Sequence, residues 1–227
     1  MIKEQVKSKD RVRDHGEVFT NEREVNAMLD LVKEETENID STFLEPACGD
    51  GNFLAEILNR KLKIVKEKYK KPLDDYDLYS IKAISSIYGV DILEDNVEAC
   101  IKRLYGIWEK EYDSVMKTYV NPKTKDACLY ILKKNILCGD ALTMLKNDKT
   151  PIVFAEWSFT VGSMVKRRDY ELSKMLEVEQ ITNTSDYCLF TFDEDINKEI
   201  RQNLDVPVRE YPLCDYREVM DYEKEKK

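Results

Sequence analysis

The fold of this chain is most restricted by one pattern near its start. A short apolar run ends in a glycine-rich turn, and a long amphipathic helix follows at once. Residues 41–45 form the apolar run, and residues 46–51 contain one proline and two glycines. Apolar residues then recur at helical spacing from Leu54 to Tyr69. Such a turn typically joins a buried strand to a helix. The sequence therefore predicts a β-α unit over residues 41–69.

The same order of elements recurs along the chain, which predicts the fold class. After a first helix that begins near Thr20-Asn21, further elements are expected as strands at 83–91, 135–138 and 151–155 and a helix at 94–112. Strands that alternate with long helices favour an α/β fold with a mostly parallel sheet and helices on both faces. We expect residues 1–160 to form the main domain and residues 161–227 to be a C-terminal extension of the same domain, without an assigned role.

Charge and cysteine content exclude several classes of protein. Asp and Glu number 45 against 36 Lys and Arg, a formal charge of -9, so the chain lacks the positive surface needed for indiscriminate nucleic-acid binding. The first residues resemble no export signal, and no apolar run approaches the ~18 residues of a membrane span. The lone His15 and six cysteines without a CxxC pair predict reduced thiols and no metal site. We expect a cytoplasmic protein.

Acidic residues stand where the predicted strands end. Glu45 precedes the glycine turn, Asp50 lies inside it, Asp91 ends the second strand and Asp140 follows the third. Ligands of open α/β sheets bind beyond these strand ends, and an acid after the second strand is placed to accept ribose hydroxyls. The turn is neither a GxGxxG nor a Walker loop, and its acid suits a cationic or hydroxyl-bearing ligand. On spacing alone, a tight turn with no ligand also explains the two glycines.

Four segments in order resemble one protein family. Residues 43–54, Phe-Leu-Glu-Pro-Ala-Cys-Gly-Asp-Gly-Asn-Phe-Leu, resemble the S-adenosylmethionine-binding loop of adenine-specific DNA methyltransferases of restriction–modification systems. Residues 15–20, His-Gly-Glu-Val-Phe-Thr, resemble the motif before the first helix of these enzymes, although Asn21 stands where the family usually has proline. Residues 89–92 and 139–141 match the second and third cofactor motifs. The resemblance covers roughly residues 11–160 and implies a Rossmann-like class I methyltransferase fold with S-adenosylmethionine as its cofactor.

The resemblance also implies which residues hold the methionine end of the cofactor. Phe19 and Thr20 would close over this end, Glu45 would lie near its amino group, and Asp50 would lie near the sulfonium. The floor of the site would consist of Ala47, Gly49 and Gly51. Acidic side chains in these places agree with a ligand that carries a positive sulfonium and a positive ammonium.

For the nucleoside end, the resemblance implies three further roles. Asp91 would accept from the ribose hydroxyls, Ile92 would pack on the adenine, and Asp140 would accept from the exocyclic amine. Any one of these residues alone is more often a solvated or structural side chain. Their coincidence at successive strand ends supports the resemblance.

The catalytic motif departs from the family pattern. These enzymes carry an Asp/Asn/Ser-Pro-Pro-aromatic segment after the fourth strand, which holds the adenine amino group and stacks on the flipped base. The aligned segment here is Glu156-Trp157-Ser158-Phe159, so the resemblance implies Glu156 as the acceptor and Phe159 as the stacking ring. The two prolines, which would fix the backbone and its carbonyl, are missing.

Two functions therefore remain open. The first is an S-adenosylmethionine-dependent, adenine-specific DNA methyltransferase of a restriction–modification or mobile-element system. Because residues 161–227 are few and acidic, it would need a specificity subunit or another partner to bind DNA. The alternative is a catalytically inactive relative that binds the cofactor and acts as a regulatory or interaction subunit. A base-sized cavity lined by Glu156 and an aromatic ring would favour the first function, and a plugged cavity the second.

Basic residues gather in two places. The run from Arg60 to Lys71 is interpreted mainly as the solvated face of an amphipathic helix. The run Lys166-Arg167-Arg168 follows the presumed catalytic segment, where contact with a phosphate is one of two open interpretations.

Overall fold

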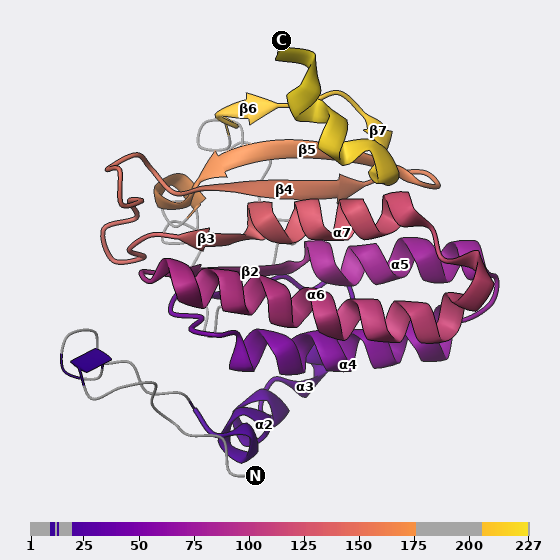
Figure 1. Ribbon diagram of the computed structural model, residues 1–227, viewed down its shortest axis with the longest axis horizontal. Coiled ribbons are helices and arrows are strands. Elements are labelled where there is room, and N and C mark those ends of the chain that lie inside the picture. Colours follow the sequence, from indigo (N-terminus) through magenta and orange to yellow (C-terminus); the bar gives the residue numbers. More distant parts are fainter. Residues whose placement is uncertain (1–9, 12, 14–19, 176–205, 227) are drawn as a thin grey trace.

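A parallel three-stranded sheet forms one part of the fold. The computed structural model describes residues 10–11, 13, 20–175 and 206–226 (Figure 1). The strands are β1 (Phe43–Glu45), β2 (Ile87–Asp91) and β3 (Ile136–Cys138), in the order β1-β2-β3. Both neighbouring pairs are parallel, with Leu44 opposite Tyr88 and Val90 opposite Leu137. The predicted mixed α/β class and the parallel pairing are confirmed.

Each crossover between these strands contains two α-helices (Figure 1). Between β1 and β2 the chain forms α4 (Asn52–Tyr69) and α5 (Leu73–Ser85). Between β2 and β3 it forms α6 (Glu94–Met116), the short 3-10 helix η1 (Lys117–Tyr119) and α7 (Pro122–Asn135). Because α4 packs on α5 and α6, and α7 also packs on α5 and α6, the four helices form a bundle. Strands β2 and β3 continue from the ends of α5 and α7, and α4 and α6 also pack against the sheet.

The second helix of each crossover is the main correction to the predicted elements. The expected polar connection near residues 72–77 is the start of α5, with Asp74 and Asp75 in its first turn, where the helix dipole favours acids. The expected second strand begins at Ile87 instead of Ala83, because residues 83–85 complete α5. Helix α7 was not predicted, although Asn121 caps it and proline opens it, which are ordinary start signals.

A buried polar group lies inside the bundle among aromatic side chains. Trp108 stacks on Tyr112 with 4.5 Å between ring centroids. The Asp77 carboxylate accepts hydrogen bonds from the hydroxyls of Tyr112, Thr124 and Tyr216. Tyr216 begins the C-terminal 3-10 helix η2 (Tyr216–Lys226). Asp77 thus joins this helix to α5, α6 and α7.

A second, antiparallel sheet is built on a hairpin. Its long strands are β4 (Val153–Phe159) and β5 (Met164–Glu171), which pair along their whole length. Two short strands, β6 (Arg209–Glu210) and β7 (Cys214–Asp215), also pair antiparallel with β5. At the other end of the chain, α2 (Glu22–Asp30) and α3 (Lys33–Glu37) pack on α4.

Strand β4 runs opposite to the parallel strands. Just before its start, Ile152 lies against Gly139, which follows β3 at the carboxyl end of the parallel sheet. Further along, the Trp157 indole N–H donates to Asn135 Oδ1 at 2.9 Å, at the amino end of β3. The direction of β4 in Figure 1 agrees with these two contacts. The carboxyl end of β4 therefore lies away from the carboxyl ends of β1, β2 and β3.

A buried lysine ties the bundle to the amino ends of the strands. Lys61 of α4 is fully buried, and its Nζ donates to the carbonyls of Ile39 and Ser41 and to the Ser86 hydroxyl. Burial lowers the pKa of Lys61 to about 7. The segments that lead into β1 and β2 are thus held by one ammonium on α4.

Replacing Lys61 by methionine is expected to remove part of the pH dependence of stability. Because the folded pKa of about 7 lies below the ordinary value of 10.5, the unfolded chain binds more protons between these values. Stability therefore rises with pH in this window, by up to about 1.4 kcal/mol per pH unit. Urea unfolding at several pH values between 7 and 10.5 measures the slope. The Lys63→Met variant, which changes an exposed lysine on the same helix, should keep it. Equal slopes for Lys61→Met and the unsubstituted chain would contradict the assignment.

Candidate functional site

The glycine turn lies at the carboxyl end of β1 and is held by backbone contacts. The Cys48 N–H donates to the Val90 carbonyl of β2 at 2.9 Å, and the Gly51 N–H donates to the Cys48 carbonyl at 2.8 Å. Gly49 and Gly51 both have positive φ, at 52° and 84°, which favours glycine over residues with a Cβ. Gly51 is also the N-cap of α4. A Cβ at Gly51 would lie 2.7 Å from the Cys100 sulfur of α6, so close packing also requires glycine there.

Asp91 connects this turn to the end of β2. Its Oδ2 accepts from the Gly49 N–H at 2.9 Å. Its Oδ1 accepts from the Leu93 N–H at 2.9 Å and from the Asn96 amide at 3.1 Å. A carboxylate offers about four acceptor positions, so one stays available on this half-buried side chain. Asp91 thus joins the glycine turn to the end of β2.

The three other acids at the strand ends lie in different surroundings. Burial raises the pKa of Glu45, which also accepts weakly from the Ala47 N–H. Asp50 forms an ion pair with Arg103 of α6, at 3.4 Å between Oδ1 and Nη1. The Leu142 N–H, which donates at 2.9 Å, holds the pKa of Asp140 below its usual value. The negative potential near the turn is therefore weaker than the count of acids suggests.

Apolar side chains at the same edge are exposed. Ile92, directly after β2, is 48% exposed, and Leu142, in the loop after β3, is 93% exposed. An aliphatic side chain beside acceptor groups is a surface on which a flat apolar ring can pack. Ile92 thus lies next to Asp91 with the exposure that its predicted role requires.

The upstream motif is described only in part. Phe19 lies outside the described residues. The Thr20 carbonyl accepts from the Asn52 amide at 3.4 Å, which places Thr20 beside the start of α4. Asn52 also accepts from Arg103 Nη1 at 2.6 Å. Arg103 therefore contacts both ends of the turn-to-helix junction, a role that the sequence interpretation missed.

The expected catalytic segment is not a loop after the fourth strand. Glu156 and Phe159 lie within β4, paired with Arg168 and Val165 of β5. The strand extends to Phe159 instead of ending at residue 155, because the turn at residues 160–163 folds β5 back along it. This part of the sequence interpretation was wrong about the secondary structure.

The location of these two residues also differs from the expectation. The Lys82 ammonium of α5 lies 5.9 Å from the centroid of the Phe159 ring and 3.1 Å from Asp40, which precedes β1. Glu156 pairs with Arg168 at 3.5 Å. Both side chains thus lie toward the amino ends of β1 and β2, whereas the glycine turn lies at the carboxyl ends. The structure does not bring Glu156 and Phe159 to the turn.

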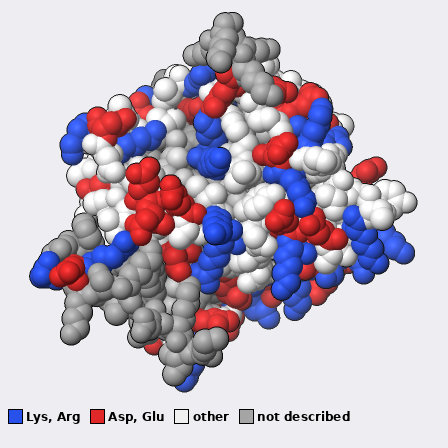
Figure 2. All heavy atoms as spheres, in the orientation of Figure 1, with Lys and Arg blue, Asp and Glu red and all other residues white. Residues whose placement is uncertain are grey.

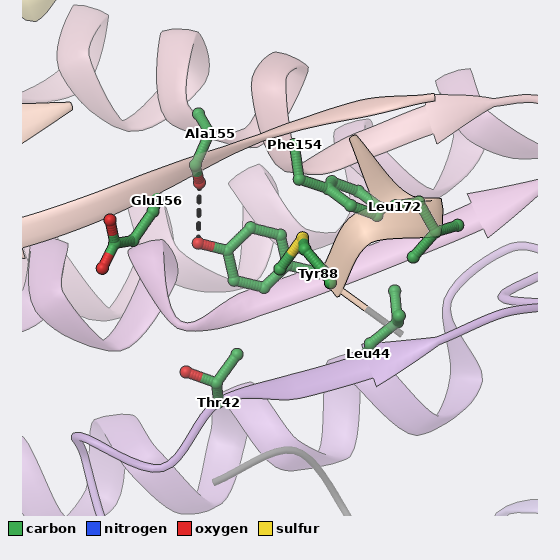
Figure 3. Close-up of a pocket in the computed structure, with 8 residues that line it drawn as sticks. Thr42, Leu44, Tyr88, Phe154, Ala155, Glu156 and Leu172 are labelled. Carbon is green, nitrogen blue, oxygen red and sulfur yellow. Dashed lines mark hydrogen bonds between the residues drawn. The ribbon is translucent and has the colours of Figure 1, made fainter. Parts of the chain in front are cut away.

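A small apolar hollow borders Glu156 (Figure 3). It lies between β1, β2 and β4, and the Tyr88 hydroxyl at its centre donates to the Ala155 carbonyl at 2.8 Å. Its other walls include Leu44, Phe154 and Leu172. The hollow has a volume of about 20 Å³, enough for one water molecule and not for a base. Among the residues that the structure describes, no base-sized cavity, as expected for an active catalytic segment, lies beside Glu156.

The two basic runs are largely engaged within the fold. Lys61 is buried, and Arg60 pairs with Asp30 and Glu56. In the second run, Arg167 is buried and paired with Asp169, and its two neighbours both pair with Glu210. The interpretation of residues 166–168 as a phosphate contact therefore loses its basis. The interpretation of the first run as a solvated face holds for its exposed lysines only.

Comparison of the chain with protein-family models, with curated proteins and with solved structures finds no match. None of the helices in the described part of the chain combines the length and apolar character of a membrane span. Within the described ranges, no three His, Cys, Asp or Glu side chains gather into a possible metal site. The five described cysteines are free thiols.

Proposed function

We propose that the chain binds S-adenosylmethionine at the carboxyl ends of β1, β2 and β3, on a Rossmann-like fold. In this proposal it acts as a regulatory or interaction subunit and does not methylate adenine through Glu156 and Phe159. The observation that carries the proposal is the hydrogen bond between Gly49 of the turn and Asp91 of β2. It joins two of the motifs on which the resemblance to adenine-specific DNA methyltransferases rests.

The nucleoside would lie over the ends of β2 and β3. The remaining acceptor position of Asp91 would take a ribose hydroxyl. Ile92 would be covered by the adenine, which accounts for its exposure in the free chain. Asp140 keeps a charged acceptor at the end of β3, where the exocyclic amine would lie.

The methionine end would lie near Glu45 and Asp50. Arg103 already balances the charge of Asp50, so Glu45 carries most of the attraction for the ligand ammonium. Burial raises the pKa of Glu45 in the free chain, and a nearby positive charge lowers it again. Cofactor binding would therefore stabilise the ionised form of Glu45.

An active adenine-specific DNA methyltransferase is the second candidate, favoured by the four ordered motifs. It would need an acceptor group other than Glu156, which lies toward the other end of the strands. It would also need a partner to bind DNA, because the chain carries a formal charge of -9.

Titration calorimetry with S-adenosylmethionine tests the proposed binding, and one molecule per chain is expected. Ile92→Glu should weaken binding by about tenfold or more, because a charge would replace about 1.4 kcal/mol of apolar contact with the adenine. The matched control is Val161→Glu, which changes an 88% exposed residue in the β4–β5 turn and should leave the affinity unchanged. Absence of binding, or equal weakening by both substitutions, would refute the proposal.

Radiolabelled methyl transfer to mixed genomic DNA separates the two candidates. The proposed role predicts no incorporation for the unsubstituted chain or for Glu156→Ala. Incorporation that Glu156→Ala abolishes would show that the segment is catalytic after all. Incorporation that survives this substitution would favour a methyltransferase with a different acceptor group.

A further inference from the structure

A groove between α4 and α6 has the size and charge of a ligand site. Its volume is about 390 Å³, within the range of ~300–1,000 Å³ that is typical of small-molecule sites. One wall carries Lys63 and Lys66 of α4, and the other carries Lys110 and Glu111 of α6. None of these residues belongs to the glycine turn or to the β4 segment. We call it the α4/α6 groove.

The charge in the α4/α6 groove is positive. Lys66 pairs with Glu111 at 2.6 Å, which engages the one carboxylate that lines the groove. Lys63 and Lys110 are exposed and form no ion pair with any residue in the described ranges. Three ammoniums against one carboxylate leave a net charge of 3 − 1 = +2. Like charges along one groove repel one another, and a bound anion relieves that repulsion.

This local excess contrasts with the rest of the molecule. The chain has a formal charge of -9. Lys61 is buried, and Arg60 and residues 166–168 form ion pairs with acids of the fold. Figure 2 shows basic side chains along the lower right of the viewed face, where Figure 1 places α4 and α6. Lys63 and Lys66 of the first basic run, together with Lys110 of α6, thus give the α4/α6 groove a local positive charge.

The floor of the groove is apolar. The apolar residues that line it are Leu62, which is buried, and Ile107, which is half-buried. Lysine binds phosphate as a compact point charge, and the aliphatic floor can cover the carbon atoms attached to a phosphate. Three ammoniums along one groove suit one group with several charged oxygens. They suit less well the single, separated carboxylates of an acidic peptide.

We propose that the α4/α6 groove binds a phosphate-bearing ligand through Lys63, Lys66 and Lys110. The shared chemistry is the phosphate group, carried either by a small molecule or by the backbone of a nucleic acid. This site is separate from the proposed cofactor site, so cofactor binding and phosphate binding can fail independently.

Calorimetric titrations at low ionic strength with inorganic pyrophosphate and with a short single-stranded oligodeoxynucleotide test the site. Binding of at least one probe is expected, and it should weaken as salt is added. The double substitution Lys63→Glu, Lys110→Glu should weaken it by about tenfold or more, because two attractions become repulsions. A gain in affinity with oligonucleotide length would identify a nucleic-acid backbone. Binding of pyrophosphate alone would identify a small phosphate ligand.

The matched control is the double substitution Lys68→Glu, Lys70→Glu. It makes the same change in net charge at the end of α4, on exposed residues that do not line the groove, and should change the affinity less than twofold. Circular dichroism verifies that both variants are folded. Equal weakening by the two variants, no binding of either probe, or equally tight binding of a poly-glutamate peptide would overturn the proposal.

Discussion

Replacing Asp77 by alanine is expected to lower the free energy of unfolding by about 3–5 kcal/mol, because three buried hydroxyls lose their acceptor. The Asp77 side chain is 5% exposed and accepts from three hydroxyls, on Tyr112, Thr124 and Tyr216. Alanine would leave these buried hydroxyls without their acceptor, at about 1–3 kcal/mol each where no other partner is found. Urea unfolding followed by tryptophan fluorescence measures the loss, since Trp108 stacks on Tyr112.

Two further variants make this expectation specific. Asp74→Ala removes an exposed acid from the first turn of the same helix and should cost no more than about 1 kcal/mol. Asp77→Asn keeps one acceptor oxygen and should fall between the two alanine variants. If Asp77→Ala cost as little as Asp74→Ala, the hydroxyls would have found other partners and the network would not hold η2 on the bundle.

The second large effect is expected for Gly51→Ala, which should cost about 2–5 kcal/mol. A φ of 84° places Gly51 in the left-handed region, at about 1–2 kcal/mol for a residue with a Cβ. The added Cβ would also lie 2.7 Å from the Cys100 sulfur, and overpacking of this kind costs about 1–3 kcal/mol. Thermal or urea unfolding measures the sum.

A double-mutant cycle separates the two causes. In a Cys100→Ala background the added Cβ meets no sulfur, so Gly51→Ala should cost only the backbone part of about 1–2 kcal/mol. Gly106→Ala in α6 is the control, because a Cβ there meets nothing within 4 Å, and it should stabilise the helix by about 0.5–1 kcal/mol. The same cost of Gly51→Ala in both backgrounds would disprove the steric contribution of Cys100.

The strand-end part of the candidate site was predictable from local sequence. A proline and two glycines after an apolar run define a turn, and the order of elements in a parallel sheet brings Gly49 and Asp91 to the same edge. What the sequence did not reveal is the balance of charge there. Arg103 neutralises Asp50 from a position 53 residues further along the chain, and no local pattern reports such a pair.

The direction of β4 was also not predicted from the sequence. This direction determines at which end of the parallel strands Glu156 lies. An apolar strand has the same composition whether its neighbour is parallel or antiparallel. The available signal was the short turn with Gly162, whose φ is 65° and which is typical of a hairpin. In the family motif, the residues that align with Glu156 and Phe159 follow the end of a strand. In this hairpin, the strand continues through both residues.

The continuity of helix and strand has a geometric consequence for the site. Packed helices lie about 8–10 Å apart and paired strands about 4.8 Å, yet α5 leads into β2 and α7 into β3, so the spacing narrows between them. Ser85, Ser86 and Asn135 lie at these helix-to-strand junctions, where the spacing narrows. The Asn135 amide donates to the carbonyls of Ser85 and Ile87, both at 3.1 Å. The Asn135 side chain therefore holds the start of β3 against the start of β2, and this contact fixes the spacing of the two strands that lead to Asp91 and Asp140.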